Sequence, residues 1–249
     1  MTASANDNAP TLPSVFDVLL YSITLTKRYA ADVYGFTAYL LFPLILYFGI
    51  QGVPGSLGKA TIAVVYAVFI GVACWVAAAV STLVSLKSAH PKNDHDPRSI
   101  GTHATNVLTP LVLATFLYWI LQAAGYFLFI IPGILATIIF TFAFEEVVLR
   151  GRGPITALAE SRTHVKHQIL AVGQRLFGVG LAYFLVYAAL SMGAIALGAA
   201  LLHTSVGGLL IDRLPLWLDA AISLIQIALV PPIVIAHTVL YLSTAPTVD

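Results

Sequence analysis

Long uncharged stretches, separated by short charged segments, limit this chain to one class of fold. Between Val107 and Phe144 there is no Asp, Glu, Lys or Arg. Over the whole sequence, hydrophobic residues make up 59% and charged residues 9%. A helix that crosses the hydrocarbon core of a bilayer needs roughly 20 mainly apolar residues. The pattern therefore predicts an all-α fold, a polytopic transmembrane helical bundle.

The lengths of the apolar stretches predict six spans. We expect spans at residues 34–50, 60–86, 170–202 and 215–242, and two more between 107 and 149. The uncharged stretch 107–144 would be about 57 Å long as a single helix, whereas the hydrocarbon core is about 30 Å thick. We expect this stretch to fold back in a tight hairpin within 126–133. The hairpin should reach the far surface, because a turn inside lipid leaves backbone polar groups without partners.

Two further helices are expected at the membrane surface. Residues 14–32 mix apolar and charged side chains, and residues 154–167 have an apolar stripe opposite a polar side. Both patterns are typical of interfacial amphipathic helices. The second stripe consists of Ile155, Leu158, Val165 and Ile169. The predicted parts are a cytoplasmic N-terminus at 1–33, a six-span membrane domain at 34–242 and a short cytoplasmic tail at 243–249, with a polar loop at 87–104.

The basic residues fall mainly on one side of this arrangement. That side holds Lys27, Arg28, Lys87, Lys92, Arg98, Arg150, Arg152, Arg162, Lys166 and Arg175, and the other holds Lys59 and Arg213. Because cytoplasmic loops carry the excess of Lys and Arg, both termini are predicted to be cytoplasmic. The net charge of +1 gives no basic field for a nucleic-acid partner. The polar residues 1–13 lack a signal-peptide pattern, so the first span is expected to be an uncleaved insertion signal.

The stretch 129–167 carries a recognisable order of residues. Pro132 and Gly133 lead into a span, an acidic position follows, Pro154 opens a helix, and Ser161 and Lys166 lie within it. This order resembles the signature of YciC-like bacterial inner-membrane proteins, and of the related membrane domain of some glycerophosphodiester phosphodiesterases. The resemblance implies a multi-pass protein of the bacterial cytoplasmic membrane without an assigned reaction. It does not carry over the phosphodiesterase activity, which belongs to a separate soluble barrel.

Two adjacent glutamates near the end of the fourth span are candidate functional residues, as ionisable groups within membranes generally are. Glu146 stands four residues before Arg150, the spacing of a helical ion pair, and an interfacial salt bridge is the simplest interpretation. Glu145 has Leu149 at that spacing and points about 100° away. We expect it to face the bundle, where it is a candidate proton or cation site.

The last span carries two further candidates, Gln226 and His237. Gln226 is deep and needs a hydrogen-bond partner. Pro231 and Pro232 lie between the two, and they are expected to break or kink this helix because they remove two backbone donors. Broken spans often mark substrate sites in transporters, although a purely structural kink explains the pair as well.

Histidines outside the spans suggest metal binding only weakly. Glu160, His164 and His167 share one helical face, a spacing that can hold a divalent metal. A solvated helix surface explains the same pattern. His90, His95 and Asp96 lie in a polar loop and are read as loop residues. We therefore expect no metal and no cofactor.

Three functions remain open at this point. The leading hypothesis is an integral membrane protein without a catalytic site, acting in the envelope through membrane lipids, a membrane-protein partner or a second copy of itself. The alternative is a small transporter or lipid-handling permease that uses Glu145, Gln226 and the kinked sixth span. The third is a membrane-embedded enzyme using Glu160, His164 and His167. A water-filled cavity reaching Glu145 would favour the permease.

The predicted sidedness can be tested by cysteine labelling in intact bacteria. With Cys74 replaced by Ala, single cysteines at Lys92 and Arg162 should resist a membrane-impermeant maleimide until the cells are lysed. A cysteine at Lys59, on the opposite side, should react in intact cells and is the matched control. Labelling of Lys92→Cys or Arg162→Cys from outside would contradict the orientation.

Overall fold

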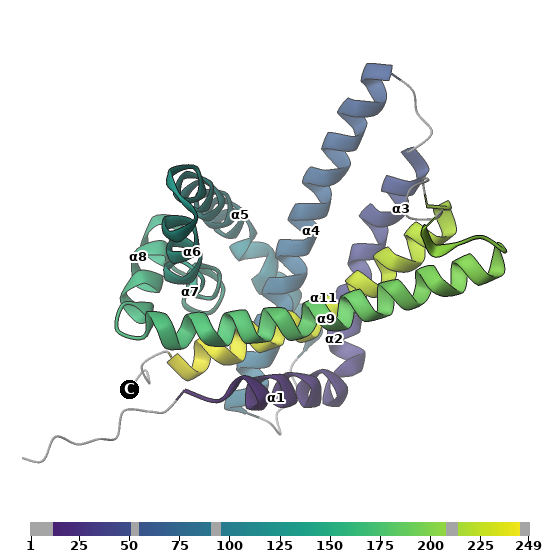
Figure 1. Cartoon of the computed structure of the whole chain (residues 1–249). Helices are drawn as coiled ribbons and strands as arrows, with labels where there is room; N and C mark the ends of the chain where they lie inside the picture. The colour runs from purple at the N-terminus through teal and green to yellow at the C-terminus, as the bar shows by residue number, and fades with distance from the viewer. Residues whose placement is uncertain (1–11, 51–54, 91–95, 208–213, 245–249) are drawn as a thin grey trace, which may run out of the picture.

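The computed structural model describes residues 12–50, 55–90, 96–207 and 214–244. Within these ranges every regular element is a helix, which confirms the all-α prediction. Six helical segments there are long and apolar enough to cross a membrane, so the chain is a multi-pass membrane protein by the length and composition of its helices. Figure 1 shows α9 (Ile169–Leu201) and α11 (Leu216–Thr244) side by side, and α11 packs against α4 (Gly55–Ala89).

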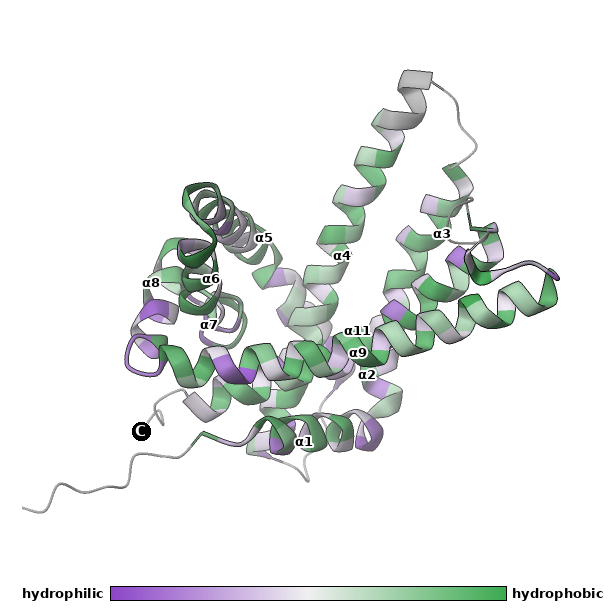
Figure 2. Ribbon diagram, viewed as in Figure 1, coloured by the Kyte–Doolittle hydropathy of each residue, from purple (hydrophilic) through white to green (hydrophobic). Residues whose placement is uncertain are grey.

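The spans are built as follows. The first consists of α2 (Ala30–Thr37), a short 3-10 turn (Ala38–Leu40) and α3 (Leu41–Ile50); the second is α4 (Gly55–Ala89) and the third α5 (Pro97–Leu128). The fourth consists of α6 (Ile130–Ile139) and α7 (Ala143–Arg150), the fifth is α9 (Ile169–Leu201) and the sixth α11 (Leu216–Thr244). The two additional helices are α1 (Val15–Arg28) and α8 (Pro154–Val165). Figure 2 shows hydrophobic residues along most of each span and hydrophilic ones on α7, α8 and the first turns of α9.

The third span begins earlier than the sequence analysis predicted. The polar loop was expected to continue to residue 104, but α5 already starts at Pro97. The Asp96 side chain accepts a hydrogen bond from the Arg98 amide at 3.0 Å, and proline occupies the first helical position. Both features stabilise a helix start, so the polar residues 97–104 form the first turns of a helix.

The hairpin between the third and fourth spans lies where it was predicted. α5 ends at Leu128, Phe129 is extended, and α6 begins at Ile130. Two glycines let the helices approach: a Cβ on Gly125 would lie only 2.9 Å from the Cα of Gly133. The tip is apolar, and Phe127 is 93% exposed. Its position at the far membrane surface stays a prediction.

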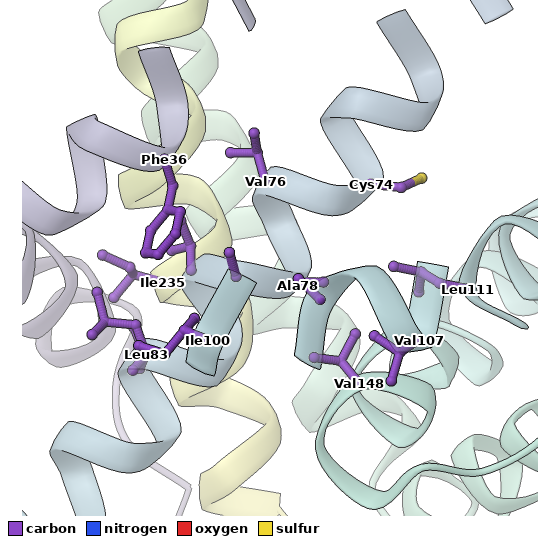
Figure 3. Packing of buried hydrophobic residues seen from close by; sticks show 14 of the residues in the cluster. Phe36, Cys74, Val76, Ala78, Leu83, Ile100, Val107, Leu111, Val148 and Ile235 are labelled. Carbon is purple, nitrogen blue, oxygen red and sulfur yellow. The ribbon is translucent and has the colours of Figure 1, made fainter. Parts of the chain in front are cut away.

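The main core forms around the middle of α4. Ala78, Ala79 and Val80 of α4 are fully buried, and the small side chains of the two alanines let neighbouring membrane helices pack closely. Further along, Leu83 packs in the same cluster as Ile100 of α5 and as residues of α7 and α11 (Figure 3). Cys74 belongs to this cluster as well, as expected of a small packing residue.

Helix α1 packs on the bundle through a chain of hydroxyl groups. Its Ser22 hydroxyl lies 2.9 Å from the Tyr183 hydroxyl of α9, which donates to the Pro232 carbonyl of α11 at 3.1 Å. The opposite side of α1 exposes apolar residues such as Phe16. At 14 residues, α1 is too short to cross a bilayer. Its predicted interfacial position stays a prediction.

Helix α8 is docked on the bundle. It buries Ala157, Leu158, Ser161 and Val165, whereas Ile155, the first residue of the predicted stripe, is exposed. The apolar stripe therefore begins one turn later than predicted. Its contacts with α5, α6 and α7 place it against the end of the fourth span.

Helix α11 does not break at its two prolines. It continues from Leu216 to Thr244, so of the two predicted outcomes the break is absent, and the kink stays a prediction. Pro232 lacks the amide that would bond to the Ala228 carbonyl. The Tyr34 hydroxyl of α2 donates to that carbonyl instead, at 3.3 Å. The unpaired backbone group is thus satisfied from a neighbouring helix, as membrane helices with internal proline require.

The close approach of Gly125 and Gly133 can be tested with alanine. Gly125→Ala should lower the stability by about 1–3 kcal/mol, because its Cβ would meet backbone and not a movable side chain. Gly193→Ala in α9 is the matched control: its Cβ would have nothing within 4 Å, and alanine favours helix by up to about 1 kcal/mol. Thermal unfolding of the two purified variants in one detergent measures this. Equal melting temperatures would contradict the tight hairpin.

Candidate functional site

The fourth span is interrupted in its middle. Between α6 and α7, residues 140–142 form a turn, and Ser161 of α8 completes its hydrogen bonding. The Ser161 hydroxyl accepts from the Phe142 amide at 3.1 Å and donates to the Ile139 carbonyl at 2.9 Å. Irregular backbone at membrane depth is tolerated only where it is buried in protein or lines a cavity. No break was predicted at this position from the sequence.

The first charged residue after the break is Glu145, whose side chain is 1% exposed. His237 of α11 lies against it, with Nδ1 2.5 Å from the Glu145 Oε1. The other ring nitrogen of His237 is 3.0 Å from the Thr141 hydroxyl, at the break itself. The Oε2 atom of Glu145 is buried and has no hydrogen-bond partner among the described residues. Glu145 thus lies inside the bundle, as its helical position suggests.

Glu146 is equally buried but faces other partners. Its Oε1 accepts a hydrogen bond from the Tyr241 hydroxyl at 2.9 Å and lies 2.9 Å from Nδ1 of His164. Its Oε2 lies 3.9 Å from Nε of Arg150. The predicted pair with Arg150 is therefore present, and Glu146 is buried inside the protein with 0% exposure. Its predicted position at the membrane interface stays a prediction.

The environment of His164 differs from the prediction. This residue was expected on a solvated helix face with Glu160 and His167, yet its side chain is only 8% exposed and contacts Glu146. The difference arises because α8 docks on α7, so one side of its polar face becomes internal. His164 therefore belongs to the buried cluster and not to a surface metal site.

Each buried carboxylate has an imidazole within contact distance. Glu145 pairs with His237, and Glu146 pairs with His164. Burying an ionised group is costly unless it is paired. Within each pair, a shared proton can lie on the carboxyl group, which leaves both side chains neutral, or on the imidazole, which gives two opposite charges. Neither state leaves one charge without a partner. The cluster can therefore hold and pass protons at the end of an apolar span.

A cavity of about 230 Å³ reaches this cluster. Its walls come from α5, the turn at 140–142, the start of α7 and His237 of α11. Thr115, Tyr118 and Thr141 supply hydroxyl groups to an otherwise apolar lining. The imidazole of His237 is 27% exposed, whereas Glu145 lies behind it. A solute or water in the cavity can thus contact the imidazole, and through it the carboxylate.

The structure does not bring Gln226 to this site. Gln226 lies 11 residues before His237 in the unbroken α11, about 16 Å away along the helix axis. It lines a different cavity, together with Asp219. Among the described residues, no group of three His, Cys, Asp or Glu side chains is placed to hold a metal ion. His95 lies outside the described residues.

Three residues of the predicted signature have clear structural positions. Gly133 makes the close contact with Gly125, Pro154 is the first residue of α8, and Ser161 completes the break. Lys166 is exposed just after α8, and Pro132 lies in the first turn of α6. Thr141 and Tyr241 were not predicted to be site residues. A single hydroxyl group inside an apolar stretch does not indicate a site until the helix that packs against it is known.

Comparisons with protein families, with curated proteins and with solved structures found no match for this chain. The resemblance to YciC-like proteins therefore stays a prediction from the sequence.

The role of Ser161 at the break can be measured directly. Ser161→Ala removes both hydrogen bonds to the interrupted backbone and should lower the stability by about 1–3 kcal/mol. Thr163→Ala is the matched control on α8: its exposed hydroxyl bonds only to the Ala159 carbonyl of its own helix. The control should change the stability by less than about 0.5 kcal/mol. Similar thermal unfolding of the two variants would show that Ser161 does not support the break.

Proposed function

We propose that this chain is a small permease of the bacterial cytoplasmic membrane, with both termini in the cytoplasm, that couples movement of a small solute to protons. Glu145 is the residue that takes up the proton, and His237 connects it to the cavity. The cluster has no catalytic role in this proposal, and the protein is not an enzyme.

One observation carries the proposal: a broken span, a cavity and a buried carboxylate occur at the same place. The turn at 140–142 lines the cavity, and the His237 imidazole joins that cavity to Glu145. Ionisable residues within spans typically mark proton relays and substrate pathways. Interrupted helices supply the polar backbone that transporters use for binding.

The geometry suggests a route for the proton. A proton from the cavity reaches the Nε2 side of His237, beside the Thr141 hydroxyl. The imidazole then releases the proton on its Nδ1 side to Glu145. Neutralising the carboxylate weakens its hold on His237, and with it the contact between α7 and α11. Proton uptake can therefore change the relative stability of two arrangements of these helices, which is what coupling requires.

Glu146 has a structural role in this proposal. It joins α7 to Tyr241 of α11 and His164 of α8. These contacts hold the end of the fourth span while the neighbouring pair changes its protonation.

A second candidate is the leading hypothesis from the sequence, in which the protein acts through contacts with lipids or a membrane-protein partner. The apolar hairpin tip favours it, because Phe127, Phe129 and Ile130 are all strongly exposed. Native mass spectrometry of the protein from gently solubilised membranes would separate the two candidates. A constant stoichiometric protein partner supports the second.

The permease can be tested in liposomes containing the purified protein and a pH-sensitive dye. Small amines, quaternary ammonium ions, neutral solutes and carboxylates are each added from outside, and proton movement is recorded. One class should drive proton flux through the wild-type protein. Glu145→Gln keeps the shape of the side chain but loses its charge, so its flux should fall to the level of protein-free liposomes.

The matched control is Glu160→Gln, which changes an acidic residue of α8 outside the cavity lining. It should retain the wild-type flux. Proton flux that persists in Glu145→Gln, or a wild-type protein that responds to no solute class, would contradict the proposal.

A further inference from the structure

A second cavity, of about 360 Å³, lies between α3, α4 and α11. It is separate from the Glu145 site: the two cavities share no lining residue. Its volume falls within the range of about 300–1,000 Å³ that is usual for small-molecule sites. Apolar residues form much of its wall, and a small number of polar groups lie on one side.

The polar groups follow one face of α11. Asp219, Ser223 and Gln226 are spaced by four and three residues, so they lie one above another along the helix. In the described part of the chain, Asp219 forms no ion pair with a basic side chain. A carboxylate in a largely apolar cavity is stabilised by a positive charge. The cavity therefore has a negative group with room for a cation beside it.

Aromatic rings form the opposite wall. Tyr47 of α3 and Tyr66 of α4 are neighbours, with their ring centroids 5.8 Å apart and their planes inclined by 56°, and Phe69 lies about one helical turn after Tyr66. The faces of such rings attract cations, and quaternary ammonium groups in particular are recognised by aromatic cages. A carboxylate on one side and tyrosines on the other form a complementary site for a charge surrounded by methyl or methylene groups.

We propose that this cavity binds a small organic cation of the alkylammonium class. The cationic nitrogen lies between Asp219 and the rings of Tyr47 and Tyr66, while Ser223 and Gln226 accept hydrogen bonds from a polar group on the ligand. An inorganic cation fits the site less well, because tyrosine rings and apolar walls do not replace its hydration shell. The proposal goes beyond the permease function and does not depend on it, since it concerns equilibrium binding alone.

The test uses choline as the probe, and its uncharged carbon analogue 3,3-dimethylbutan-1-ol as the matched comparison. Binding to the purified full-length protein in lipid nanodiscs is measured by isothermal titration calorimetry. Choline should bind saturably and the neutral analogue should not. Asp219→Asn should weaken choline binding by about tenfold or more, because it removes the charge. Tyr66→Leu should weaken it by about threefold or more, because it removes a ring face.

Two control variants keep the result interpretable. Tyr21→Leu changes an exposed tyrosine of α1 outside the cavity, and it should bind choline as the wild type does. Glu145→Gln should also bind normally, whether or not it transports. Melting temperatures close to that of the wild type show that each variant is folded. Equal binding of choline and its neutral analogue, unchanged binding by Asp219→Asn, or loss of binding in Glu145→Gln would each overturn the proposal.

Discussion

Two adjacent carboxylates buried at the end of a membrane span are the constraint on which much of this structure depends. Glu145 and Glu146 cannot share partners, because consecutive helical residues point about 100° apart. Each therefore requires its own polar contact from a different direction: His237 of α11 for the first, and His164 of α8 with Tyr241 of α11 for the second. The contacts of the two glutamates therefore tie α7 to both α8 and α11.

The interruption of the fourth span follows from the same arrangement. Thr141, which bonds to His237, lies within the turn at residues 140–142. The freed backbone groups are then completed by the Ser161 hydroxyl. The irregular turn is thus joined to the histidine pair through Thr141 and to α8 through Ser161.

Much of the fold, and only part of the site, could be predicted from the sequence. The span count and the hairpin follow from length, hydropathy and the two glycines, which are local properties of the chain. The break at 140–142 could not be predicted, because Phe-Thr-Phe contains neither glycine nor proline and its stabilising hydroxyl lies 19 residues further along. Conversely, Pro231 and Pro232 suggested a break or a kink, and α11 has no break there. One of the two missing bonds is compensated by Tyr34, almost two hundred residues away in sequence.

Helix α11 links the two polar regions of the molecule. Asp219 and Gln226 line a cavity near its start, and His237 and Tyr241 contact the glutamates near its end. Between them, the prolines would leave a weak point in an isolated helix. Here the Tyr34 and Tyr183 hydroxyls bond to carbonyls on either side of that region and tie it to α2 and α9. The middle of α11 is therefore held by two neighbouring helices, and it separates the cavity at Asp219 from the cavity at the glutamate cluster, which share no lining residue.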